Sequence, residues 1–213
     1  KEGNAMKTTR LIIVIGLLCL LVSLPGIARD RGGQVAWDVG AYFNDVYGIT
    51  LEFPEIHGWE FELADLKTDV RGEYIIVEIL KAKLQDSNVG LCLRAATDPA
   101  LMGTGMTNWD YYSSLRRALK AEPRQETTEF IFLHGFYEGI LWRYTASMGG
   151  GNYRFVNYLT RRPGANFCLT FHAPTDEMDE AWEEVEMIAD TVRFYDSVLL
   201  GGEMKRIFIE LNY

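Results

Sequence analysis

The sequence contains none of the short motifs that mark the common catalytic and nucleotide-binding sites. There is no G-x-S-x-G nucleophile elbow, no H-E-x-x-H zinc motif, no P-loop and no dinucleotide-binding fingerprint. Histidine is scarce, because the chain has only His57, His134 and His172. A histidine-rich metal site or a Ser-His-Asp triad would therefore depend on the correct placement of one of three residues. We expect neither a metal nor a cofactor.

Cysteine is equally rare. Of the 3 cysteines, Cys19 lies in an N-terminal apolar run, which leaves Cys92 and Cys168 in the rest of the chain. These two are too far apart in sequence for a C-x-x-C redox motif and too few for a cysteine metal cage. In an oxidising compartment they are a candidate disulfide, which would stabilise the chain by about 4 kcal/mol in the chain-entropy model. Two buried free thiols are the alternative.

Basic residues are outnumbered. The chain has 21 lysines and arginines against 30 acidic residues, a formal net charge of −9. Nucleic acids and anionic membrane surfaces are bound mainly through Lys and Arg, so this balance disfavours both as partners. The aromatic content of 13% is too high for a disordered chain.

The N-terminal segment has the layout of a secretory signal peptide. Lys7 and Arg10 precede an apolar run from Leu11 to Leu24, and small residues follow at Gly26 and Ala28. This run is short against the roughly 20 residues that span a bilayer, so we expect cleavage after Ala28 and no stable membrane span afterwards. The alternative is an uncleaved anchor. A cleaved signal predicts a periplasmic or secreted protein.

Hydrophobic periodicity indicates a mixed chain with most of its strands in the middle. A hairpin of two strands is expected first, and three further strands should form an antiparallel meander, because Gly-rich and Pro-Gly turn sequences separate them. The expected strands are 74–84, 89–96, 139–148, 153–161 and 166–173.

Two helices are expected from capping residues and apolar stripes. The first covers 107–121, with Thr107 and Asp110 in capping positions. The second begins with Thr175 as its N-cap and has acidic residues in its first turns, at the positive end of the helix dipole. Its largest apolar side chain is Trp182, which we expect to anchor the helix on the core.

Phrases near both ends of the chain resemble the PsbP-like family. They are YGITLEFP at 47–54 followed by Gly58-Trp59, NFCLTF at 166–171, and the closing Val192-Arg193-Phe194. The family includes the photosystem II subunit PsbP, a yeast Ran-binding import factor and bacterial periplasmic DcrB-type proteins. The resemblance implies an α+β fold, with one antiparallel sheet packed between helices as an α/β/α sandwich. It also implies a binding or accessory role without a catalytic centre.

These observations divide the chain into five parts. The alternating Ile207, Ile209 and Leu211 near the C-terminus indicate an additional edge strand. We expect a tag or upstream artefact at 1–5, the signal peptide at 6–28, an N-terminal extension at 29–41, one PsbP-like domain at 42–195 and a C-terminal extension at 196–213.

Strand alternation predicts a polar sheet face. In the strands 89–96, 139–148 and 166–173, alternate residues are apolar and the residues between them are polar. If the strands share one sheet, its second face could bind a carboxylate, a phosphate or an acidic peptide, or it could simply be a hydrated surface. The residues on that face would be Arg94, Arg143, Thr145, Thr170 and His172, with Cys92 and Cys168.

Our first hypothesis is therefore an exported, non-catalytic binding or accessory protein of the cell envelope. Its partner would be an envelope protein or a small anionic ligand. The second hypothesis is a secreted hydrolase with an unrecognised site around His172 or His134, which would need a carboxylate or hydroxyl beside the histidine.

Overall fold

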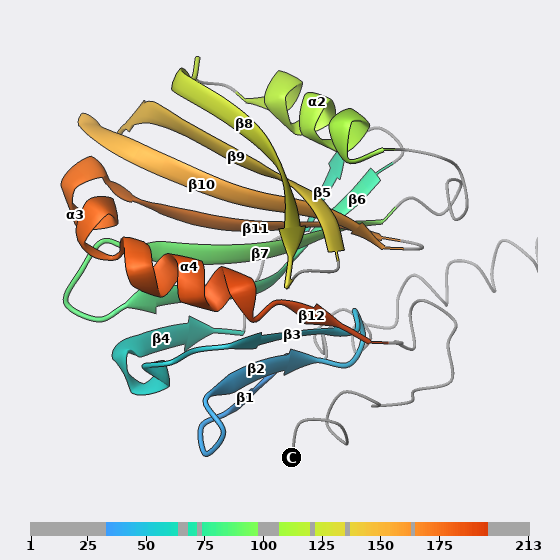
Figure 1. Cartoon of the computed structure of the whole chain (residues 1–213), viewed down its shortest axis with the longest axis vertical. Coiled ribbons are helices and arrows are strands. Elements are labelled where there is room, and N and C mark those ends of the chain that lie inside the picture. Colours follow the sequence, from blue (N-terminus) through green and yellow to red (C-terminus); the bar gives the residue numbers. More distant parts are fainter. Residues whose placement is uncertain are drawn as a thin grey trace, which may run out of the picture. The chain divides into compact units, whose positions relative to one another are not determined.

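The computed structural model describes residues 33–63, 68–71, 74–97, 107–119, 122–134, 137–162 and 165–195 (Figure 1). They form two antiparallel sheets and three α-helices. The expected tag, the signal peptide and the C-terminal extension with its predicted edge strand lie outside the described residues.

The larger sheet has the strand order β4-β6-β7-β11-β10-β9-β8, with β5 paired to the other part of the β6 edge. The five predicted strands are confirmed as β6, β7, β9, β10 and β11, and the predicted hairpin and meander are both present. The strands of this sheet are β4 Trp59–Glu62, β5 Thr68–Arg71, β6 Tyr74–Leu84, β7 Gly90–Thr97, β8 Arg124–Leu133, β9 Tyr137–Met148, β10 Gly151–Arg162 and β11 Ala165–Pro174.

A smaller sheet joins the two ends of the described chain. Strands β1 (Gly33–Ala36), β2 (Ala41–Asn44) and β3 (Ile49–Glu52) form a meander, and β12 (Arg193–Phe194) pairs with β3. The short 3-10 helix η1 (Ile56–Gly58) leads from this sheet into β4. The sequence predicted one sheet, so the second sheet corrects that expectation.

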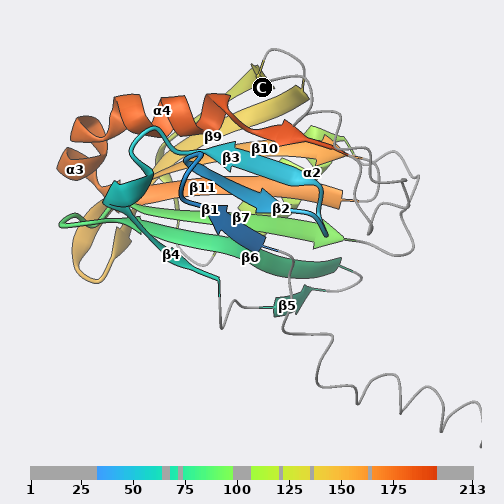
Figure 2. The ribbon, with the colours of Figure 1, turned by 90° about the horizontal axis from the view of Figure 1, so that it is seen from below.

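Helices cover both faces of the larger sheet, as predicted. Helix α2 (Asn108–Ala118) packs on one face, over β9 and β10. The short α3 (Thr175–Glu180) and α4 (Trp182–Asp190) lie on the other face, and α4 also contacts β3 of the smaller sheet. Figures 1 and 2 show α2 on one side of the larger sheet, and α4 with the smaller sheet on the other.

The main core fills the space between the two sheets and α4. Phe167, Leu169 and Phe171 of β11 point into it, and Ile188 of α4 meets them with no exposed surface. A second, smaller core lies under α2, where Tyr111 packs with residues of β9 and β10. The larger sheet is therefore apolar on both faces, which the alternation argument did not anticipate.

A β-bulge in β6 changes which side chains share a face. The register to β7 shifts between Glu78 and Leu80, and Ile79 and Leu80 are both completely buried in the main core. The extra residue lets Lys81 lie on the same face as Glu78, three positions earlier. Without the bulge, Lys81 would point into the apolar core.

Both predicted helices form, and the second differs in detail. Thr107 and Asp110 make a reciprocal capping box at the start of α2, because each backbone N–H donates to the other residue's side chain. The helix after β11 takes Pro174 as its N-cap, not Thr175, and is interrupted at Ala181. Trp182 is only partly buried, so it is not the expected main anchor. Met178, Val185, Ile188 and Ala189 are the fully buried members of the stripe.

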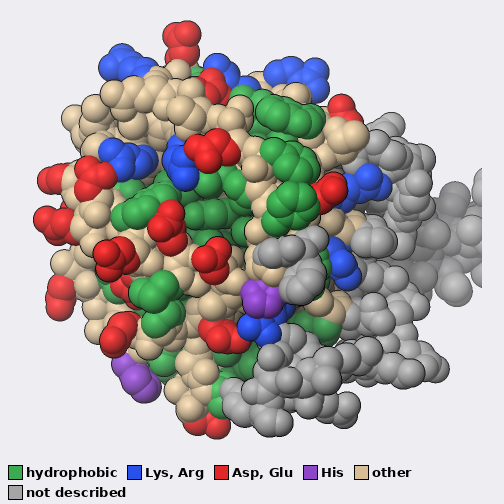
Figure 3. All heavy atoms as spheres, in the orientation of Figure 1, with side chains coloured by type: hydrophobic (Ala, Val, Ile, Leu, Met, Phe, Trp, Pro, Cys, Tyr) green, Lys and Arg blue, Asp and Glu red, His purple; other side chains and the backbone are tan. Residues whose placement is uncertain are grey.

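Acidic side chains are prominent on the face that carries α3 and α4 (Figure 3). On α4 itself, Glu183, Glu186 and Asp190 are exposed. Within the described ranges, no helix is long and apolar enough to cross a membrane.

We expect Ile188→Ala to lower the free energy of unfolding by about 2–5 kcal/mol, because the substitution opens a cavity in the main core. The adjacent Met187 is 47% exposed, so Met187→Ala serves as the control, with a change within about 0.5 kcal/mol. Urea unfolding of both variants measures the difference. Equal effects would show that α4 presents another face to the core.

Candidate functional site

A cavity of about 520 Å³ lies between α2 and the face of the larger sheet that α2 covers. Tyr111 and Leu115 of α2 form part of its roof, and residues from β6, β7, β9, β10 and β11 form its floor and walls. Its lining combines aromatic rings with a compact polar group. This composition is typical of small-ligand sites.

Strand register determines which side chains meet in the cavity. The pairing of β7 with β11 sets Arg94 opposite Cys168, Cys92 opposite Thr170, and Gly90 opposite His172. The three predicted site residues Arg94, Thr170 and His172 thus lie together with both cysteines, and all five line the cavity.

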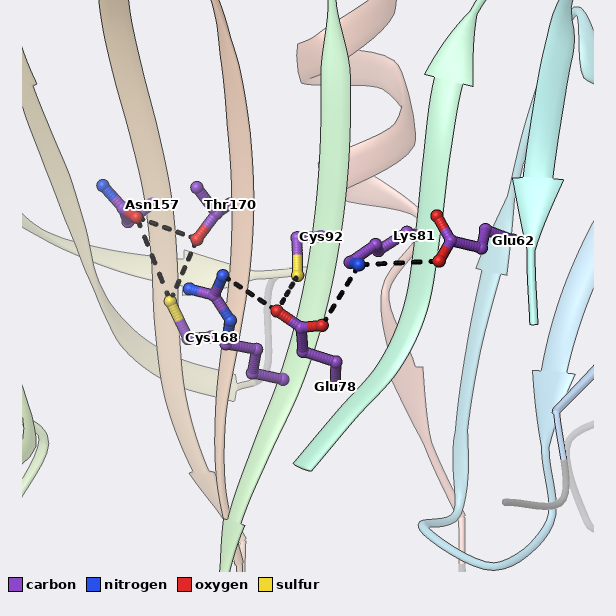
Figure 4. Close-up of polar contacts among 8 residues, drawn as sticks. Glu62, Glu78, Lys81, Cys92, Asn157, Cys168 and Thr170 are labelled. Atoms are coloured by element: carbon purple, nitrogen blue, oxygen red, sulfur yellow. Dashed lines mark hydrogen bonds and ion pairs between the residues drawn. The ribbon is translucent and has the colours of Figure 1, made fainter. Parts of the chain in front are cut away.

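An ion cluster occupies one side of the cavity (Figure 4). The Glu78 side chain is only 9% exposed, and its Oε1 accepts a hydrogen bond of 3.3 Å from Nη2 of Arg94. Its other carboxylate oxygen lies 3.3 Å from Nζ of Lys81, which also lies 3.6 Å from Oε1 of Glu62. A carboxylate buried to this degree requires cationic partners, because desolvation of an unpaired charge is costly.

Both cysteines are free thiols rather than the candidate disulfide. They occupy adjacent strands but different register positions, so they are diagonal neighbours. Diagonal pairs lie about 7–8 Å apart, whereas a disulfide needs Cβ atoms within about 4.5 Å. Burial raises the pKa of the Cys92 thiol to about 12 and also raises that of Cys168, despite the opposing effect of Arg94.

Hydrogen bonds between neighbouring strands give the polar side chains of the cavity floor their partners. The Thr170 hydroxyl donates to Oδ1 of Asn157 at 2.9 Å, and Nδ2 of Asn157 donates to the Trp142 carbonyl at 3.1 Å. The Cys168 sulfur lies 3.3 Å from the same hydroxyl. Such a network holds the floor in one arrangement.

A row of aromatic rings crosses the sheet beside this floor. Trp142 and Tyr144 have ring centroids 4.7 Å apart, and Tyr144 stacks on Phe155 at 4.9 Å with an interplanar angle of 10°. Phe155 stacks in turn on His172 at 6.0 Å. Tyr112 of α2 meets Trp142 edge to face.

The His172 ring packs directly against Gly90, where there is no room for a side chain. A Cβ atom on Gly90 would lie 2.5 Å from Cε1 of the His172 ring, far inside van der Waals contact. Burial lowers the pKa of His172, and the charge of Arg94 lowers it further. The imidazole is therefore neutral at pH 7.

Arg143 and Thr145 do not belong to this site, which corrects the predicted polar face. They lie on the opposite face of the sheet, where Arg143 pairs with Glu129 and lies 5.4 Å from the Trp182 ring centroid. The prediction assumed that Trp142 and Tyr144 face the main core. They face α2 instead, so the side chains of β9 lie on the faces opposite to those predicted.

The two histidines of the hydrolase hypothesis lie in different surroundings. Nδ1 of His134 lies 3.1 Å from the backbone carbonyl of Asp190, after the end of β8. His172 lies in the cavity, where its ring stacks on Phe155. Over the described part of the chain, no three His, Cys, Asp or Glu side chains converge as metal ligands.

Sequence reasoning missed Glu78, Asn157 and the roof formed by α2. Glu78 carried a signal, because it is an isolated acid in the apolar run YIIVEIL. Asn157 carried a similar one between Val156 and Tyr158. Neither signal says on which face the residue lies, since that depends on the bulge and on long-range pairing.

No model of a known protein family matches the chain, and no curated protein sequence matches it. Among solved structures, it is similar to the cyanobacterial PsbP, CyanoP, from Synechocystis sp. PCC 6803, at 14% identity and a TM-score of 0.50. That match covers 81% of this chain and 96% of CyanoP. LpqN of Mycobacterium tuberculosis, a protein involved in cell envelope biogenesis, is 14% identical over 68% of this chain and 81% of LpqN, with a TM-score of 0.39.

The likeness to CyanoP shows a PsbP-like α+β fold, as the sequence resemblance predicted. At this identity it shows the fold alone, and the likeness to LpqN is too weak to carry an argument.

We expect Gly90→Ala to destabilise the protein by about 1–3 kcal/mol, because the new methyl group would overlap the His172 ring. Removing that ring in the double variant Gly90→Ala/His172→Ala should recover part of the loss. A double-mutant cycle by denaturant unfolding measures the coupling, expected at about 0.5–3 kcal/mol. Strictly additive effects would contradict the close packing.

The lowered pKa of His172 predicts a pH dependence of stability. Below about pH 6.5 the unfolded chain binds a proton at this residue while the native state does not, so stability falls as the pH falls. The wild type should lose stability more steeply than His172→Gln between pH 7.5 and 5.5, by at most about 1.4 kcal/mol per pH unit. If the free energy of unfolding changed equally with pH in the two proteins, the pKa of His172 would not be lowered.

Proposed function

We propose that the protein is an exported, non-catalytic binding protein of the cell envelope, and that the cavity beneath α2 is its ligand site. The observation that carries this proposal is the cavity itself. It combines about 520 Å³ of space, an aromatic wall and a charged side chain, Arg94, at one side. Export is supported by the signal-peptide layout of residues 6–28.

The state of the reactive groups favours binding over catalysis. Burial holds Cys92 and Cys168 as protonated thiols, which are poor nucleophiles. The Thr170 hydroxyl donates its proton to Asn157, so no base activates it. His172 is neutral but stacks on an aromatic ring and, among the described residues, no carboxylate orients it.

The cavity has an accessible end and a deep end. Ala118 on the last turn of α2 is exposed, and Met148 at the end of β9 is 44% exposed. Tyr111 and Cys168 are buried and form the deep end. A ligand would enter between Ala118 and Met148, with the aromatic wall along its path.

A substitution at the mouth tests the proposal without altering the core. Ala118→Trp should fill the entrance, whereas Ser113→Trp places the same side chain at another exposed position of α2. The full chain is purified from its host under native conditions, and bound small molecules are released and identified by mass spectrometry. We expect a compound in near-stoichiometric amount with the wild type and Ser113→Trp, and its loss with Ala118→Trp.

Identical small-molecule profiles for all three proteins would contradict a ligand site in the cavity. If an envelope protein then co-purified equally with all three, the partner would be a protein bound on another surface. Circular dichroism and melting curves establish that each variant is folded.

A further inference from the structure

We propose that the ligand is a small aromatic monocarboxylic acid, with its carboxylate bound by Arg94 and its ring against the aromatic wall of the cavity. This inference rests on the binding function proposed above and specifies the class of molecule bound. It follows from the hydrogen-bond donors that the cavity leaves available, from its charge and from its shape.

Arg94 has unused hydrogen-bonding capacity. A guanidinium carries five N–H donors, but among the described residues only Nη2 has an acceptor, the Glu78 carboxylate at 3.3 Å. The side chain is 41% exposed, and Arg94 lines the cavity. The remaining donors are therefore available to a ligand in the cavity, with the planar geometry that binds a carboxylate in a bidentate manner.

The other polar groups of the floor are already paired. Thr170 and Asn157 bond to each other and to the backbone of Trp142. His172 is the second available group, because its ring nitrogens hydrogen-bond to no described residue. As a neutral imidazole it can donate one N–H to a ligand, four register positions along the strands from Arg94. Of these two available groups only Arg94 is charged, so Arg94 is the donor for an acid group.

The charge of the site favours a monoanion. Among the described residues, the charged side chains that line the cavity are Glu78 and Arg94, which balance each other. Lys81 lies just beyond them, shared with Glu62. A carboxylate adds one negative charge beside an arginine. A dianionic phosphate would add two negative charges near the buried Glu78 carboxylate. Arg94 alone would not compensate the resulting repulsion and the cost of desolvation.

The walls favour a planar ring over an aliphatic chain. Trp142, Tyr144, Phe155 and His172 form a continuous series of ring contacts along one side, and Tyr111 and Leu115 lie opposite on α2. A planar ring can stack on or meet these rings edge to face, which contributes beyond the burial of apolar area. A cavity of about 520 Å³ accommodates one or two fused rings with an acid group.

Three probes separate these contributions by calorimetric titration of the full chain. They are 2-naphthoate, the uncharged 2-naphthamide of the same shape, and decanoate, an aliphatic acid. We expect 2-naphthoate to bind the wild type at least tenfold more tightly than either of the others. Arg94→Met should reduce its affinity to that of the amide, while Arg117→Met, which removes an exposed arginine of α2, should leave it unchanged.

Two further variants keep the result interpretable if Arg94→Met is unstable. Glu78→Gln/Arg94→Met removes both charges and leaves no buried carboxylate without its arginine. Arg94→Lys keeps the charge and loses the bidentate geometry. We expect the first to bind acid and amide equally, and the second to bind 2-naphthoate with intermediate affinity.

Equal binding of acid and amide by the wild type would overturn the carboxylate assignment, and equal binding of 2-naphthoate and decanoate would overturn the aromatic one. If no probe binds but Ala118→Trp still loses a host compound, the ligand class is wrong and the binding function stands. If no probe binds and Ala118→Trp changes nothing, both proposals fail.

Discussion

The pairing of β7 with β11 is the contact on which the rest of the structure depends. It joins the hairpin of β6 and β7 to the meander of β8 to β11, so one sheet forms from two separate stretches of chain. Its register aligns Arg94 with Cys168 and Gly90 with His172. A shift of β11 by one residue would turn its apolar side chains away from the main core and remove Cys168, Thr170 and His172 from the cavity.

The cavity places a charged cluster on a sheet face that would otherwise be apolar. Glu78 is held there by Arg94 and Lys81, and Lys81 reaches it only because the bulge in β6 adds one residue. Replacing such a buried ion pair with apolar side chains often leaves stability unchanged or improves it. A cluster with unused donors facing a cavity is therefore easier to explain by recognition of a ligand than by stability.

The residue pattern within single segments predicted most strands of the larger sheet. The strands β6, β7, β9, β10 and β11 were predicted from apolar runs, alternation and turn sequences, and the faces of β7 and β11 were assigned correctly. The phase of β9 was wrong, because α2 provides a second apolar environment for Trp142 and Tyr144. Strand β8 was missed, since as an edge strand it exposes Phe130 and Phe132 and carries polar residues on both faces. These misassignments depend on contacts distant in sequence.

The smaller sheet closes only when Phe194 pairs with Ile49, near the opposite end of the described chain. Strand β3 therefore cannot pair with β12 until nearly the whole domain has been synthesised. Contacts between residues so far apart in sequence form slowly. A chain that ends before Phe194 would therefore lack the strand that closes the smaller sheet, so this sheet depends on both ends of the domain at once.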